Sequence, residues 1–97
     1  MKIKIETIRE NPVNLLRRAG YAFQRREQDK MSFVRPLARS GYPRFHVYTE
    51  MEKDALIINL HLDQKRETYG QATRHHGEYE DSRVVEDEAV RIKQLVL

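Results

Sequence analysis

The chain of 97 residues contains no cysteine and no tryptophan, and it has only four glycines and three prolines. Without cysteine it can form neither a disulfide nor a thiolate metal site. No apolar run approaches the ~18 residues that a membrane-spanning helix needs. The first residues alternate in polarity instead of forming the apolar block of a signal peptide. We therefore expect a single domain over residues 1–97, located in the cytoplasm and not bound to a membrane.

Charge is plentiful but unevenly distributed along the chain. Charged residues make up 34% of the sequence and hydrophobic residues 39%. Residues 1–48 carry eleven Lys and Arg against four Asp and Glu, a net charge of +7. Residues 49–97 carry seven against eleven, a net charge of −4. The basic half favours RNA or another polyanion as a partner, while the opposed halves also fit a homodimer.

Residues 43–63 contain two runs of alternating polarity on either side of the polar turn Glu52–Ala55, a pattern that predicts a β-hairpin. A loop with an even number of residues fixes which side chains share a face, and an odd loop would scatter them. One face is then apolar, with Phe45, Val47 and Thr49 opposite Leu62, Leu60 and Ile58. The other face is polar, with Arg44, His46 and Tyr48 opposite Asp63, His61 and Asn59.

The remaining elements follow from periodicity and from capping residues. Residues 2–8 alternate and predict a strand, and Asn11-Pro12 starts a short helix that Gly20 ends. Residues 21–26 and 31–37 predict a second hairpin, in which Pro36 is tolerated only at an edge or a strand end. Its expected core anchors are Tyr21, Phe23, Phe33 and Val34.

Residues 64–80 show neither period and predict a long loop. A final helix begins at Asp81 or Ser82 and buries a stripe of Val85, Ala89, Ile92 and Val96, while Glu86, Asp87 and Glu88 near its start complement the helix dipole. The element order is thus β-α-β-β-β-β-α. It predicts the α+β class, with an antiparallel sheet of four to five strands and two helices packed on one of its faces.

The polar face of the central hairpin is a candidate chemical site. Imidazole and carboxylate ligands suit Zn²⁺ or Mn²⁺, so a divalent metal is one hypothesis, although no cofactor is expected by default. The candidate ligands are His46, His61, Asp63, His76 and Glu78. Asp63-Gln64-Lys65 also resembles the (D/E)xK pattern of nucleases, which adds Lys65 to His46, His61 and Asp63 as catalytic candidates. The alternative is that both histidines are ordinary strand residues.

Arginines interleaved with aromatic residues in the first half predict a nucleic-acid surface. Arginine binds phosphate in a forked geometry, and aromatic rings stack on unpaired bases. The candidate residues are Arg17, Arg18, Arg25, Arg26, Arg35 and Arg44. The alternative is that these arginines only solvate a sheet edge and block unwanted strand pairing.

Two resemblances bear on these hypotheses. The run LLRRAGYAF at residues 15–23, followed by a basic hairpin, resembles the opening of HicA-type mRNA-interferase toxins, which have a double-stranded-RNA-binding-like α-β-β-β-α fold. The strand that carries the catalytic histidine of that family corresponds here to residues 31–35, which hold no histidine, so the resemblance implies only fold and RNA preference. The segments PRFHVYTE, INLHLDQK and RHHGEY resemble a set of short bacterial proteins with no assigned activity.

The leading functional hypothesis is a binding module for RNA or another phosphate-rich ligand. The alternatives are a metal-dependent hydrolase or nuclease that uses the His/Asp/Glu cluster, and a protein-interaction module or homodimer.

Overall fold

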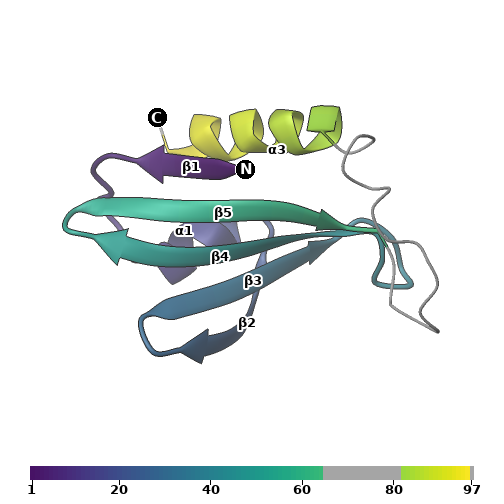
Figure 1. Ribbon diagram of the computed structural model, residues 1–97, viewed down its shortest axis with the longest axis horizontal. Helices are drawn as coiled ribbons and strands as arrows, with labels where there is room; N and C mark the ends of the chain where they lie inside the picture. The colour runs from purple at the N-terminus through teal and green to yellow at the C-terminus, as the bar shows by residue number, and fades with distance from the viewer. Residues whose placement is uncertain (65–81, 97) are drawn as a thin grey trace.

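The computed structural model describes residues 1–64 and 82–96. It confirms the α+β class and the predicted element order. The strands are β1 (Lys2–Ile5), β2 (Ala22–Glu27), β3 (Lys30–Pro36), β4 (Arg44–Glu52) and β5 (Ala55–Asp63), and the helices are α1 (Pro12–Arg18) and α3 (Ser82–Leu95). All five strands form one antiparallel sheet in the order β1-β5-β4-β3-β2 (Figure 1). Neither described helix is long and apolar enough to cross a membrane.

Strand β1 forms one edge of the sheet. It pairs with β5, the last of the five strands along the chain. Its alternation works as predicted, because Ile3 and Ile5 are buried while the lysines between them point to the other face. The strand ends at Ile5, earlier than predicted. Ile8 lies beyond it and its backbone N–H donates to the carbonyl of Asp54 at 3.1 Å.

Helix α1 is capped at both ends as the sequence predicts. The Asn11 side chain accepts from the Val13 N–H at 2.7 Å, and Pro12 occupies the first helical position. At the other end Gly20 has φ +95°. The Gly20 N–H donates to Arg17 and the Tyr21 N–H to Leu16, at 3.0 and 2.9 Å, which is a Schellman motif. The motif turns the chain sharply into β2.

The β2–β3 hairpin has a two-residue turn, Gln28-Asp29, with Gln28 at φ 58°. Two of its predicted core anchors are correct and two are wrong. Tyr21 and Phe33 are buried, but Phe23 is 50% exposed because β2 is the other edge strand of the sheet. Val34 points away from the core, since its neighbour Phe33 points into it.

Both helices pack on the same face of the sheet and share one core with it. Figure 1 shows α1 behind the sheet and α3 running along β1. Buried side chains from α1 and α3 join those of β1, β3, β4 and β5 in a single cluster, which includes Ile3, Leu15, Leu16, Phe33, Phe45, Val47, Leu56, Ile58, Leu60, Val85, Ala89 and Ile92. Val85, Ala89 and Ile92 of the predicted stripe are buried as expected, whereas Val96 lies after the end of α3 and is only partly buried against the core.

The acidic residues Glu86, Asp87 and Glu88 do not have the predicted role at the start of α3, because none of them lies in its first turn. Glu88 is buried, and its carboxylate accepts from the Tyr21 hydroxyl at 2.7 Å and from Arg91 Nε at 2.9 Å. Arg35 Nη1 lies 3.5 Å away, and Arg91 also donates to the Ala19 carbonyl at 2.6 Å. The cluster ties α3 to the end of α1 and to β3.

Candidate functional site

The β4–β5 register is the predicted one. The turn has two residues, Lys53-Asp54, and Lys53 adopts φ 61°. Each predicted pair therefore forms: Arg44 faces Asp63, His46 faces His61 and Tyr48 faces Asn59. Alternation places all six side chains on the sheet face opposite the helices. We call this surface the histidine face; it also carries Lys2 and Lys4 from β1, Arg25 and Glu27 from β2, Lys30, Ser32 and Val34 from β3, and Glu50 and Glu52 from β4.

Asp63 organises one end of the histidine face. Its Oδ2 atom accepts from Arg44 Nε at 3.1 Å and lies 3.3 Å from Nδ1 of His46. The Arg44 guanidinium is also 4.6 Å from the centre of the Tyr42 ring. The second ring nitrogen of His46, Nε2, is buried and has no hydrogen-bond partner in the part of the chain that the structure describes. Arg44 and Asp63 thus fix the orientation of the imidazole from one side only.

Three rings form a continuous row across β4 and β5. The His46 and Tyr48 rings lie 4.6 Å apart at 33°, and the Tyr48 and His61 rings lie 5.9 Å apart at 69°. Tyr48 is in the middle of the row and is 38% exposed, whereas the His46 side chain is only 13% exposed. Rings stacked or edge-on at these separations attract one another. Tyr48 is therefore a supported aromatic surface that faces solvent.

The surroundings of His61 favour its neutral form by lowering its pKa. Partial burial lowers its pKa, and the ammonium group of Met1 lowers it further, against the opposing effect of Asp63. The Met1 ammonium is held nearby by a 3.0 Å hydrogen bond to the carbonyl of Leu60. A neutral imidazole can both donate and accept a hydrogen bond. The Met1 ammonium and Lys2 add positive charge at this end of the face.

A hollow of about 290 Å³ lies beside the tyrosine. Lys30, Tyr48, Glu50, Asn59 and His61 line it. Its polar side chains include an ion pair, with Lys30 Nζ 3.8 Å from Glu50 Oε1. The volume is at the lower end of the roughly 300–1,000 Å³ typical of small-molecule sites. The hollow has room for a single planar group, not for a folded partner.

The arginines predicted to bind nucleic acid do not converge on one surface. Arg25 and Arg44 are on the histidine face, whereas Arg26 is on the opposite side of the sheet, with Nη2 3.8 Å from Met31 Sδ. Arg35 lies against the core, paired with Glu88 and 5.9 Å from the Phe45 ring. The two arginines of α1, Arg17 and Arg18, are exposed on the helix side.

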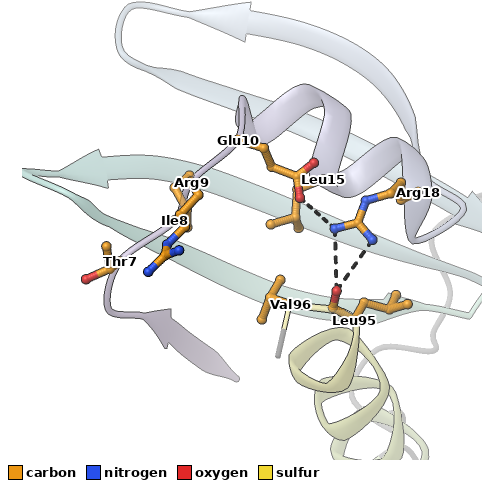
Figure 2. A pocket seen from close by; sticks show the side chains of 8 residues that line it. All are labelled: Thr7, Ile8, Arg9, Glu10, Leu15, Arg18, Leu95 and Val96. Carbon is orange, nitrogen blue, oxygen red and sulfur yellow. Dashed lines mark hydrogen bonds and ion pairs between the residues drawn. The ribbon is translucent and has the colours of Figure 1, made fainter.

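Arg18 lines a second hollow of about 500 Å³, between α1 and the end of α3 (Figure 2). Its guanidinium donates to the Glu10 carboxylate and to the carbonyl of Leu95, the latter at 3.4 Å. These contacts join α1 to the last turn of α3. Since the guanidinium is already bound to a carboxylate, it is poorly placed to bind phosphate.

The candidate metal and catalytic residues are only partly placed. His46 and Asp63 are in contact, and His61 is on the same face. Lys65, His76 and Glu78 lie outside the described residues. Within residues 1–64 and 82–96, no group of three or more His, Cys, Asp or Glu side chains is arranged to hold a metal ion.

Sequence reasoning missed two contributors to the histidine face. The pairing of β1 with β5 brings Lys2 and the Met1 ammonium beside His61, and the pairing of β3 with β4 brings Lys30 beside Glu50. The alternation of residues 2–5 predicts the strand that brings Lys2 and Met1 to this face, but it does not predict that the strand pairs with β5. Comparison of the chain with protein-family models, with curated proteins and with solved structures finds no match.

Proposed function

We propose that the chain is a binding module for RNA or another phosphate-rich ligand, and that the ligand lies on the histidine face. One observation carries the proposal: Tyr48 presents an exposed ring, flanked by His46 and His61, on a sheet face that neither described helix covers. Aromatic side chains on an open sheet are a common platform for unpaired bases, whose planar faces stack on them whatever the sequence.

The groups around Tyr48 complement the rest of a nucleotide. Asn59 and neutral His61 offer hydrogen-bond donors and acceptors on one side of the ring. The Met1 ammonium and Lys2 supply positive charge for a phosphate near His61. Stacking contributes about 1–3 kcal/mol per base, so one or two bases give a modest affinity.

Charge balance limits how much phosphate this surface can neutralise. Several of its cations already have carboxylate partners: Lys4 is 3.6 Å from Glu52, Lys30 pairs with Glu50, and Arg44 pairs with Asp63. Among the described residues of this face, the Met1 ammonium, Lys2 and Arg25 have no carboxylate partner. The slope of log K against log salt should therefore be about −2, given roughly −0.7 per phosphate contacted on a single strand.

The experiment is fluorescence anisotropy with a short unstructured RNA, titrated with the intact chain at several salt concentrations. Tyr48→Ala should weaken binding about 5- to 150-fold, the equivalent of one lost stacking contact. The matched control is Phe23→Ala, which removes an exposed ring, 5.6 Å from Phe33, on the opposite face of the sheet. This control should bind RNA like the unmodified chain.

Two results would contradict the proposal. Equal affinities for the Tyr48→Ala and Phe23→Ala variants would remove the histidine face from the binding surface. A salt slope near zero would show that no phosphate is contacted. Circular dichroism of both variants ensures that a loss of binding is not a loss of fold.

A further inference from the structure

The hollow beside Tyr48 has an ordered pattern of hydrogen-bonding groups. Glu50 contributes a carboxylate, which only accepts, and Lys30 contributes an ammonium, which only donates. The two groups lie 3.8 Å apart, and they line the hollow together with Tyr48. Both charged side chains remain accessible, with 63% of Lys30 and 41% of Glu50 exposed. A planar ligand stacked on Tyr48 would present its edge to this pair.

An edge that fits must carry an acceptor for the ammonium and, next to it, donors for the carboxylate. Guanine has this sequence of groups on its Watson–Crick edge: O6 accepts, and N1–H and the N2 amino group donate. The two donors can bind the two carboxylate oxygens together, as in other bidentate pairs. We propose that the hollow selects an unpaired guanine base, with Glu50 bound to N1 and N2 and Lys30 bound to O6.

The other three bases fit less well for a simple reason. Adenine and cytosine place an acceptor ring nitrogen where guanine has N1–H, and cytosine and uracil place the O2 carbonyl where guanine has the N2 amino group. Each of these bases therefore has an acceptor at one of the two positions. That acceptor would face the Glu50 carboxylate, and two acceptors repel each other. Selection therefore depends on the carboxylate, while stacking on Tyr48 is common to all four bases.

This inference rests on the proposed function, and the experiment separates the two. The probes are labelled single-stranded RNA pentamers of uridine in which the central residue is guanosine, inosine, adenosine or uridine. Inosine keeps O6 and N1–H of guanosine but lacks the N2 amino group. The protein is the intact chain, compared with Glu50→Gln and with a matched control, Glu52→Gln. Glu52 is on the same face of β4 and pairs with Lys4, outside the residues that line the hollow.

The guanosine pentamer should bind about tenfold more tightly than the uridine pentamer, as expected for one bidentate contact to a base. Inosine should lose most of that advantage. Glu50→Gln should abolish the preference, so that the guanosine and uridine pentamers bind alike, and Glu52→Gln should retain it.

Equal binding of all four pentamers, with Tyr48→Ala still weakening each one, would overturn guanine selection and leave the proposed function in place. A guanosine preference that survives Glu50→Gln would overturn the assignment of the carboxylate. No binding of any pentamer would overturn both the inference and the proposed function.

Discussion

Asp63 shows how single residues shape the histidine face. Its Oδ2 atom contacts both Arg44 and His46, so a side chain that the nuclease hypothesis would assign to a metal is occupied by two neighbours. Tyr48, two residues after His46 on β4, is exposed, as is His61. The chemistry available to a ligand is accordingly that of an aromatic ring with neutral and charged hydrogen-bonding groups around it.

Glu88 is the residue with the largest expected effect on stability. Burial alone would raise its pKa, but hydrogen bonds from Arg91 and Tyr21 outweigh burial and hold the pKa below its ordinary value. Glu88→Gln keeps the shape but removes the charge that Arg91 and Arg35 face. We expect the free energy of unfolding in urea at neutral pH to fall by roughly 3 kcal/mol, as when a buried ion pair is broken.

The pH dependence of this effect has a defined sign. Because the pKa of Glu88 is lower in the folded chain, its contribution is complete above the ordinary carboxyl pKa of about 4.3 and is lost as the pH falls through the folded value. The original chain and Glu88→Gln should therefore converge in stability at acid pH. Glu86→Gln, at an exposed position of the same helix, is the control and should change stability by no more than about 0.5 kcal/mol. A constant difference at all pH values would contradict this account.

At the scale of elements, the joint between α1 and β2 depends on Gly20. Its φ of +95° is costly for any residue with a Cβ atom, and a Cβ there would meet Nε of Arg35 at 3.3 Å. Gly41 has a similar φ of +97°, but a Cβ there would meet nothing within 4 Å. A side chain would therefore strain the backbone at both glycines, but only at Gly20 would it also crowd a neighbouring residue.

We expect Gly41→Ala to lower the free energy of unfolding by about 1 kcal/mol through backbone strain alone. Gly20→Ala should lower it further, because Arg35 must also move away from its position beside Glu88 and Phe45. Urea unfolding of the two variants checks this order. Equal losses would show that Arg35 adjusts without cost.

The elements that the sequence predicts correctly are those fixed by local rules. The pairing of His46 with His61 follows from alternation and from a two-residue turn, and the ends of α1 follow from Asn11 and Gly20. The misplaced anchor Phe23 depends on which strand is at the sheet edge, which is a long-range property. Helical spacing alone places Glu88 on the buried stripe, three residues after Val85 and four before Ile92. Its contact with Tyr21 spans 67 residues, however, and no local rule predicts that partner.

At the scale of the whole molecule, the arrangement is one-sided. The described helices α1 and α3 cover one face of the sheet and share its core, and neither of them lies on the histidine face. The arginines of the basic half are divided between the two sides, and Arg35 is paired within the core. A surface selected for total positive charge would place them together, so the proposed binding surface rests on the aromatic row and not on the sum of charges.

The most direct test of this account is a titration of the ¹⁵N-labelled intact chain with an unstructured RNA pentamer, followed by the backbone amide NMR spectrum. We predict that the largest shifts fall on Lys2, Tyr48, Asn59 and His61, and that Arg17 and Arg18 on α1 do not move. Shifts confined to α1, or no shifts at millimolar RNA, would contradict the claim that the histidine face is the binding surface.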